Sequence, residues 1–260
     1  MNVGGAQTLR RGLSVLRLLT RTGPGGLRMS EIGRRLGLNK TTANRLTRTL
    51  VDEGFVVHDA ASACYRLGPE AFAIGLAAEP SYVLQRMAAP LLRMLAEESG
   101  DTVFFSVLHG YESICLSRDE GDFPIRNQLI KPGDRWPLGV GAGSCALLAA
   151  RSDKEVDEIL KTNAAVRHDR FARCTDDAIR ALIDEARLRG YVVQPGLVLE
   201  ESWAVGAVVY DVDRRPVASL SIAALRSRLG PQRQQELGER LLAASGELTQ
   251  LQREPALTPR

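Results

Sequence analysis

The sequence is poor in aromatic residues, histidine and cysteine, and each shortage argues against a class of protein. Phe, Trp and Tyr make up 5% of the 260 residues, which argues against a surface that stacks nucleobases. The cysteines lie about 30 or more residues apart, with no Cys-x-x-Cys pair and no histidine nearby, so the spacing of a zinc site is absent. We expect four free and mostly buried thiols, at Cys64, Cys115, Cys145 and Cys174.

The sequence also lacks a long hydrophobic run. Its longest apolar stretch, around Gly139 to Ala150, is interrupted by glycines and ends at Arg151, whereas a membrane-spanning helix needs roughly 20 apolar residues. The first residues lack the basic start and apolar core of a signal peptide, since Arg10 and Arg11 interrupt them. We therefore expect a cytoplasmic protein without a membrane partner.

Charge is distributed unevenly, although the whole chain carries only +3. Residues 1–68 hold 11 Lys or Arg and four Asp or Glu, a net charge of +7, and residues 69–260 carry −4. Lys and Arg gain affinity for nucleic acids by releasing the counterions condensed on phosphates. The first segment is therefore the one expected to meet a polyanion, although many basic surfaces are only solvated.

Periodicity in the basic segment predicts a helix-turn-helix at about residues 29–48. Gly37 supplies the turn, and Ala43, Leu46 and Leu50 form one buried stripe on the helix that follows it. The expected helices are one between Leu9 and Leu19, a second over Glu31–Leu36 capped by Ser30, and a third from its cap Asn39 to about Glu53.

The third helix carries polar groups suited to DNA. In a helix-turn-helix this helix enters the major groove, and the residues off its buried stripe include types that fit adenine, thymine and guanine edges. These residues are Thr41, Thr42, Asn44 and Arg45. We expect Lys40 and Arg48 mainly to hold phosphate. The alternative is a small helical domain that binds protein.

A β-hairpin is expected next. Phe55–His58 and Cys64–Leu67 are strand-like runs around the polar turn Asp59–Ser62. Three helices followed by a hairpin make a winged helix-turn-helix, in which Arg66 on the wing is expected to contact the DNA backbone.

The acidic segment is predicted to form a mostly antiparallel sheet with helices packed on it, an α+β fold. A long amphipathic helix over Tyr82–Glu98 can link the two domains. The other expected elements are the strands Thr102–Leu108, Ser113–Ser117 and Ile125–Ile130, the helices Ser144–Ala150, Lys154–Leu160 and Asp176–Arg189, the strands Ala204–Tyr210 and Val217–Ala223, and the helix Pro231–Leu251.

Several stretches resemble the IclR-type transcriptional regulators. Four stretches resemble the DNA-binding domain of that family: Leu9–Leu16, Met29–Leu46, Gly54–Val56 and Tyr65–Gly68. Four more resemble its effector-binding domain: Pro137–Leu138, Gly143–Ser144, Arg189–Tyr191 and Ala218–Ile222. The resemblance covers about residues 8–252. It implies a winged helix-turn-helix domain over 6–68, a helical linker over 69–99 and a GAF-like effector-binding domain over 84–254.

The sequence departs from the family pattern in two places. After Pro-Leu the family often has His-Ala-Thr-Ala-x-Gly-Lys-Ala, whereas Gly139–Ala146 lacks the His and the Lys. Many members carry paired acidic residues after Gly-Tyr, where this chain has Val192–Leu197. The effector chemistry of better-known members is therefore not transferred to this chain.

Features that suggest an enzyme are incomplete. The glycine-rich run from Gly139 resembles the Gly-x-Gly-x-x-Gly motif that binds dinucleotides, but Ser144 takes the place of its last glycine. The sequence also lacks a clear βαβ unit followed by an acidic residue that would bind the ribose. Cys145 near a helix start could be a nucleophile, yet none of the histidines is a recognisable catalytic partner, which favours a packed thiol. Those histidines are His58, His109 and His168. We expect no cofactor and no metal.

The glycine-rich turn is instead expected to form a sensory pocket. Small residues let a ligand approach the backbone, and free N–H groups at a helix start favour a carboxylate. The alternative is a tight helix–sheet packing turn without a ligand. The resemblance to the family implies, by position in its pattern, six candidate ligand-binding residues: Ala142, Gly143, Pro195, Ala204, Ser221 and Ala223. Ser144 lies on the same turn, and Leu129 or Trp203 is expected to shape the walls of the pocket.

The sequence thus predicts a transcription factor that binds a palindromic double-stranded operator and a small organic effector, aromatic or carboxylic. One helix in one groove reads only a few base pairs, so at least a homodimer is expected, joined through the first helix and Tyr82–Glu98. The family suggests a dimer of dimers. Two alternatives remain, a DNA-binding architectural protein whose second half only dimerises, and a small-molecule enzyme with a fused basic domain.

Overall fold

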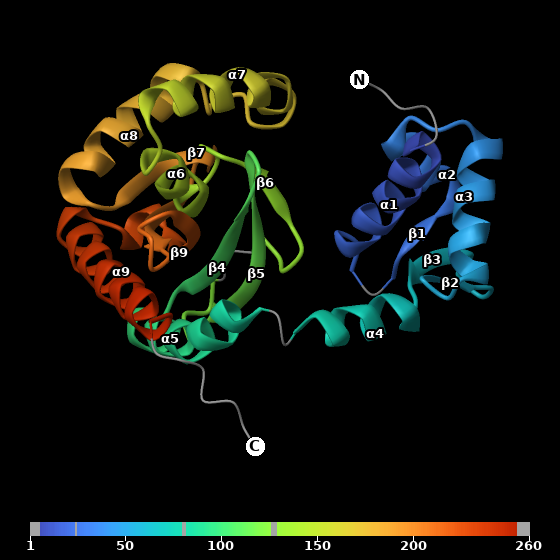
Figure 1. The fold of residues 1–260 in the computed structure, drawn as a ribbon, viewed down its shortest axis with the longest axis horizontal. Helices are drawn as coiled ribbons and strands as arrows, with labels where there is room; N and C mark the ends of the chain where they lie inside the picture. Colours follow the sequence, from blue (N-terminus) through green and yellow to red (C-terminus); the bar gives the residue numbers. More distant parts are fainter. Residues whose placement is uncertain (1–5, 24, 80–81, 126–128, 254–260) are drawn as a thin grey trace. The chain divides into compact units, whose positions relative to one another are not determined.

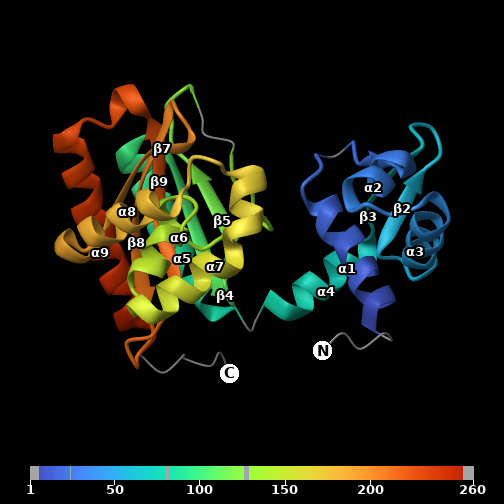
Figure 2. The same cartoon turned by 90° about the horizontal axis from the view of Figure 1, so that it is seen from above.

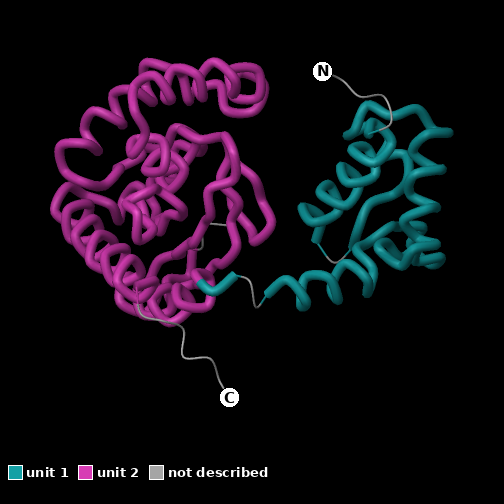
Figure 3. Tube along the Cα trace, viewed as in Figure 1, with its two compact units in different colours: residues 1–83 teal, residues 84–260 magenta. Residues whose placement is uncertain are grey.

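The computed structural model describes residues 6–23, 25–79, 82–125 and 129–253. The chain forms two compact units, residues 1–83 and residues 84–260 (Figure 3). Among the described residues, no helix is long and apolar enough to cross a membrane.

The first unit is a winged helix-turn-helix (Figure 1). A small antiparallel sheet with the strand order β1-β3-β2 lies beside its helices. In chain order the elements are α1 (Ala6–Thr20), β1 (Leu27–Arg28), α2 (Met29–Leu36), α3 (Lys40–Asp52), β2 (Val56–Asp59), β3 (Cys64–Leu67) and α4 (Pro69–Ala78). The core joins α1, α2 and the sheet through Val15, Leu19, Leu27, Ile32 and Val56.

The turn of this motif forms as predicted, and one predicted cap is wrong. Gly37 ends α2 with φ +62°, a left-handed conformation that glycine adopts without strain. The Asn39 side chain caps α3 by accepting a 2.8 Å hydrogen bond from the Thr42 N–H. Ser30, however, lies inside α2, which begins one residue earlier. The cap position is Arg28, whose N–H donates to Glu31 at 3.1 Å, so a carboxylate closes the helix start in place of a serine hydroxyl.

The second unit is built on one six-stranded antiparallel sheet, which confirms the predicted α+β fold. Its strand order is β6-β5-β4-β9-β8-β7, so β9 lies between β4 and β8. The strands are β4 (Thr102–His109), β5 (Glu112–Glu120), β6 (Arg135–Pro137), β7 (Val192–Leu199), β8 (Ser202–Tyr210) and β9 (Pro216–Leu225).

Helices cover both faces of this sheet (Figures 1 and 2). On one face, α5 (Val83–Ser99) and α9 (Pro231–Leu251) pack on alternate residues of the strands, among them Phe105, Val205 and Leu220. The other face carries a second core around Leu147, Leu160 and Ile179. The helices of that face are α6 (Ala142–Ala149), α7 (Asp153–Arg170) and α8 (Asp176–Arg189). Strand residues thus alternate between two different environments.

One predicted strand of the sheet is wrong, and one observed strand was not predicted. Ile125, Leu129 and Ile130 are not in a strand, and residues 126–128 of that predicted strand lie outside the described residues. The third consecutive strand is Arg135–Pro137, which pairs with β5. The sequence analysis also missed β7, an edge strand whose pairing is interrupted between Gln194 and Leu199. An edge strand tolerates the proline at position 195 that weakened the strand pattern.

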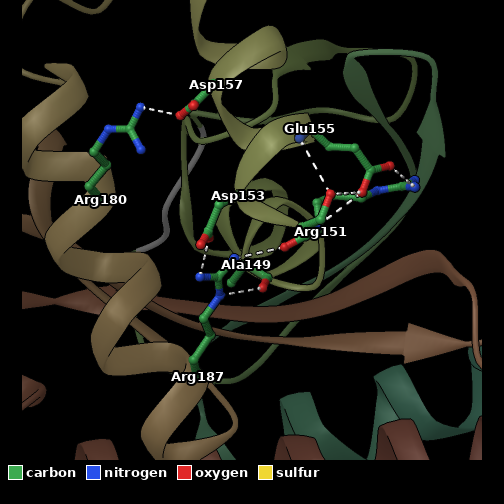
Figure 4. Close-up of polar contacts among 8 residues, drawn as sticks. Ala149, Arg151, Asp153, Glu155, Asp157, Arg180 and Arg187 are labelled. Atoms are coloured by element: carbon green, nitrogen blue, oxygen red, sulfur yellow. Dashed lines mark hydrogen bonds and ion pairs between the residues drawn. The ribbon is translucent and has the colours of Figure 1, made fainter.

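Arginine side chains fix the helices around α6 (Figure 4). Arg187 of α8 donates to the carbonyl oxygens of Ala149 at 3.1 Å and Arg151 at 2.7 Å, and pairs with Asp153 at 2.6 Å. These carbonyls lie at and just after the end of α6, where intrahelical donors run out. Arg187 therefore ties the end of α6 and the start of α7 to α8.

A buried ion pair joins the two helices of the opposite face. The Asp101 side chain is 3% exposed and accepts hydrogen bonds from Arg228 at 3.1 Å and Arg233 at 2.7 Å. Both arginines also donate to the Ser99 carbonyl at the end of α5. The start of α9 is thereby held against the end of α5.

Candidate DNA-binding surface and effector pocket

Helix α3 exposes the side chains that the sequence assigned to DNA. Ala43, Leu46 and Thr47 are buried and Leu50 is half-buried, so the stripe that anchors the helix lies on a different face from the exposed polar residues of the same turns. Thr42 is half-buried, while the remaining candidates are exposed: Lys40, Thr41, Asn44, Arg45 and Arg48. One helix therefore presents amide, hydroxyl and guanidinium groups together, as major-groove recognition needs.

The wing has a pre-formed turn. Asp59 accepts hydrogen bonds from the Ser62 hydroxyl at 2.9 Å and the Ala61 N–H at 3.0 Å. The Ser62 bond is the main reason that the pKa of Asp59 lies below its usual range, with the charge of Arg66 a smaller cause. Arg66 is exposed and lies 4.0 Å from Asp59 on the neighbouring strand. Because exposed ion pairs contribute little free energy, exchanging Asp59 for a DNA phosphate as the partner of Arg66 would cost little.

A pocket opens in the second unit between the start of α6 and the face of the sheet opposite α5 and α9. All six strands contribute to it, each by residues of one parity, such as Phe104 and Ser106 of β4. The cavity volume is about 40 Å³, which is room for a few water molecules. Seven of the nine predicted ligand residues line it: Leu129, Ala142, Gly143, Ser144, Ala204, Ser221 and Ala223.

Pro195 and Trp203 do not line this pocket. Pro195 is exposed, and Trp203 packs on the core beneath α5 and α9, with Arg226 over its ring. Successive strand residues face opposite sides of a sheet, so the adjacent residues line the pocket instead, Gln194 on β7 and Ser202 on β8. Alternation along β8 from Ala204 would have found Ser202, whereas Gln194 follows only from the pairing of β7 with β8, which places it opposite Ala204.

Helix α6 touches the sheet directly, which bears on the packing alternative. A Cβ atom at Gly143 would lie 2.8 Å from the Ser219 Oγ and 3.2 Å from the Ser221 Oγ, and one at Gly206 would lie 2.6 Å from the Ala142 carbonyl carbon. Both positions therefore require glycine for close packing. Gly143 lines the pocket and packs the helix at once, so a larger side chain there would displace α6 rather than merely fill the cavity.

The polar groups of the pocket are unevenly charged. No Lys, Arg or His is among its described lining residues, whereas Asp134 is one of them. Gln194 is only 3% exposed, and its Nε2 has no hydrogen-bond partner in the described part of the chain. A buried amide donor without a partner costs about 1–3 kcal/mol. An acceptor brought by a ligand would remove this cost.

The cysteines are free and three of the four are buried, as predicted, and burial suppresses the reactivity of these three, Cys115, Cys145 and Cys174. Burial raises the pKa of Cys145 to about 12, and it raises the pKa of Cys174 to about 11. Burial and then the charge of Asp134 raise the pKa of Cys115 to about 12. A nucleophilic cysteine needs the opposite shift. Among the described residues, no three metal-binding side chains of the His, Cys, Asp or Glu type lie close enough to hold an ion.

Comparison with known proteins identifies the family. The model of the IclR helix-turn-helix domain matches residues 8–60, and that of the bacterial transcriptional regulator IclR C-terminal domain matches residues 80–250. The chain belongs to the IclR family of bacterial transcriptional regulators. It is a DNA-binding regulator with a C-terminal effector-binding domain.

Individual relatives match over nearly the whole chain. The glycerol operon regulatory protein of Streptomyces coelicolor is 33% identical, with 92% of this chain and 91% of the relative covered. The HTH-type transcriptional repressor AllR of Klebsiella pneumoniae is 32% identical over 90% of this chain and 86% of its own. A solved IclR homologue from Microbacterium hydrocarbonoxydans, complexed with 4-hydroxybenzoate, has the same fold, with a TM-score of 0.75 at 20% identity, covering 96% of this chain and all of that one.

Proposed function

We propose that this regulator binds a palindromic operator as at least a homodimer and changes its affinity for DNA when a small organic compound enters the pocket beneath α6. The observation that carries the proposal is the buried Gln194 Nε2, which has no hydrogen-bond partner among the described residues and lies at a pocket lined also by the start of α6. Because a bacterial regulator acts on chromosomal DNA, we also propose that it works in the cytoplasm.

On the DNA side, we assign base recognition to Asn44 and Arg45 and phosphate binding to Lys40 and Arg48. The first two project from the early turns of α3 beside Thr41 and Thr42, and Arg48 lies about one turn further on. Arg66 on the wing is assigned to the DNA backbone. Base contacts set sequence preference, whereas phosphate contacts set affinity for all DNA.

The dimer interface we propose keeps the start of the first helix and replaces Tyr82–Glu98 with α4. Leu91 of the predicted linker interface is buried within the core of the second unit, and Leu16 packs in the core of the first. The first unit instead exposes apolar side chains on α4 and at the start of α1. Phe72 is 70% exposed and Leu76 and Leu9 are also exposed. Apolar surface of this kind marks protein–protein contacts.

For the effector we propose a small organic compound that carries a carboxylate or another acceptor group. The donors available are the Gln194 amide and the N–H groups at the start of α6, where the helix dipole favours negative charge. The 4-hydroxybenzoate bound to the Microbacterium homologue is a compound of this type. The raised pKa of Cys115, which lines the pocket, keeps its thiol protonated and so favours binding of the compound over its chemical conversion.

The test is a DNA-binding titration with a pocket variant and a matched control. Ala204→Leu adds bulk where the side chain faces the pocket, and Ala164→Leu makes the same change on the exposed surface of α7. On an operator selected from genomic DNA, the wild type and the control should respond to a metabolite extract, and Ala204→Leu should keep its basal affinity without responding. An unchanged response of Ala204→Leu would place effector binding elsewhere.

A further inference from the structure

A second cavity, of about 220 Å³, lies at the end of α6, whereas the effector pocket lies at its start. The ends of α6 and α8 and parts of β7 and β8 line it, and its walls include Ala149, Ala186, Val192 and Val208. Protein interiors contain few voids larger than a water molecule. A space of this size beside a helix of the effector-binding domain is therefore a candidate ligand site.

The cavity follows from the way in which α6 meets the sheet. At its start the helix touches β8 directly, since a Cβ atom at Gly206 would lie 2.6 Å from the Ala142 carbonyl carbon. Further along, Ala146 and Ala149 of the helix face the space beside Val208, and their short side chains leave it open. An apolar cavity of about 150 Å³ takes up benzene. The space at the end of α6 therefore has room for one ring with a substituent.

One charged side chain belongs to this cavity. Arg187 is the only charged residue among its described lining residues. The guanidinium donates to the carbonyl oxygens of Ala149 at 3.1 Å and Arg151 at 2.7 Å (Figure 4), so it covers the end of α6, whose dipole would otherwise repel an anion. Its ionic partner is Asp153 at 2.6 Å, a side chain that is 83% exposed. Because an exposed pair contributes little free energy, an anionic ligand can compete with Asp153 for Arg187.

We propose that this cavity is a second ligand site, which takes a compound made of one aromatic ring and one carboxylate. The ring occupies the space between Ala149 and Val208 and supplies the dispersion contacts that the walls of an empty cavity lack. The carboxylate replaces Asp153 as the ionic partner of Arg187. An amine of the same shape is excluded, because it would meet the like charge of the guanidinium. The site does not depend on the proposed effector function, since it is formed by other residues.

The first test measures binding of benzoate to the full-length protein by calorimetry, without DNA. Benzoate also has the carboxylate that we propose for the effector pocket, so the measurement uses Ala204→Leu, which fills that pocket. Benzoate should bind this variant saturably. Adding Ala149→Leu should weaken binding by about tenfold or more, because the leucine takes the room of the ring. Adding Ala164→Leu on the exposed surface of α7 should change nothing.

The contribution of charge is tested with a matched probe. Benzamide has nearly the shape of benzoate and no charge. It should bind Ala204→Leu about tenfold more weakly, which corresponds to one hydrogen bond between charged groups.

The second test predicts stronger binding, which a damaged fold does not produce. In the Ala204→Leu background, Asp153→Asn removes the competing carboxylate, so benzoate should bind about two- to fivefold more tightly. The matched control is Asp157→Asn, one turn further along α7 (Figure 4). Asp157 is also exposed, but it pairs at 2.7 Å with Arg180, which is not among the described lining residues of the cavity. This control should leave the affinity for benzoate unchanged.

Four results would each overturn the inference: no saturable binding of benzoate to Ala204→Leu, unchanged affinity after adding Ala149→Leu, equal affinity for benzamide, or equal effects of Asp153→Asn and Asp157→Asn. None of them bears on the proposed function, which is tested by the response of DNA binding to an extract and fails if Ala204→Leu leaves that response intact.

Discussion

The ion pair at Asp101 predicts a large and localised loss of stability. In Asp101→Ala, the two guanidinium groups of Arg228 and Arg233 lose their carboxylate while remaining only 25% and 31% exposed. Removing one partner of a buried pair costs about 3–5 kcal/mol. Here the arginines are partly solvated and keep the Ser99 carbonyl, so we expect about 2–4 kcal/mol.

The assay can isolate the second unit, because both tryptophans of the chain, Trp136 and Trp203, lie in it. Tryptophan fluorescence should therefore follow the unfolding of this unit alone, in urea for the free energy of unfolding and on heating for Tm. For a unit of this size a loss of 1 kcal/mol lowers Tm by about 2–4 °C, so Asp101→Ala should lower it by roughly 5–15 °C. Asp101→Asn keeps the shape and should lose most of the same stability.

The control for this prediction is Asp213→Ala, which removes an aspartate from an exposed pair with Arg215 in the same unit. Exposed pairs contribute about 0–1 kcal/mol, so this variant should unfold close to the wild type. If Asp101→Ala also unfolds within 0.5 kcal/mol of the wild type, a threshold of roughly the spread of surface substitutions, the ion pair does not hold α9 against α5 and the reasoning is refuted.

Three other predictions concern DNA, assembly and thiols. Arg45→Ala should weaken binding to the operator by about 1–3 kcal/mol and relax the preference for one base. Lys40→Ala should weaken binding to every DNA sequence and reduce by about one the slope of log affinity against log salt concentration. Equal loss of specificity by the two variants in anisotropy titrations would contradict these roles. Phe72→Glu should lower the oligomer mass in light scattering, and Leu188→Glu, at a site 90% exposed on α8, should not. Iodoacetamide at pH 8 should label native protein only at Cys64, the one cysteine that is not buried, and mass spectrometry should count four labels in urea.

Elements with strong terminal signals could be predicted from the sequence. Helix α8 begins after the capping Thr175 and ends at Gly190, which has φ +87°, and α9 begins with Pro231 in its first turn. These residues act through local backbone preferences, so no tertiary information is needed to place the ends. The recognition helix was predictable for the same reason, through Gly37 and Asn39.

The elements that failed depend on tertiary pairing. Residues Val192–Leu199 form a strand although they contain Pro195 and Gly196, because β8 supplies the pairing and an edge position needs few N–H donors. Ile125–Ile130 has a strand-like composition, yet Arg135–Pro137 takes the place beside β5. The pocket residue Gln194 was missed because candidates were taken from motif position, which does not distinguish the two faces of a strand.

The alternation along β9 separates what holds the domain together from what the domain senses. Leu220 and Ile222 belong to the core under α5 and α9, while Ser221 and Ala223 face the pocket. Single substitutions at the pocket positions can therefore change ligand preference while the opposite core keeps its volume and packing. The same division holds on β8, between Val205 and Ala204. A fold arranged in this way can acquire a new signal one residue at a time, and stability limits the change chiefly at positions such as Gly143 that also pack α6 against the sheet.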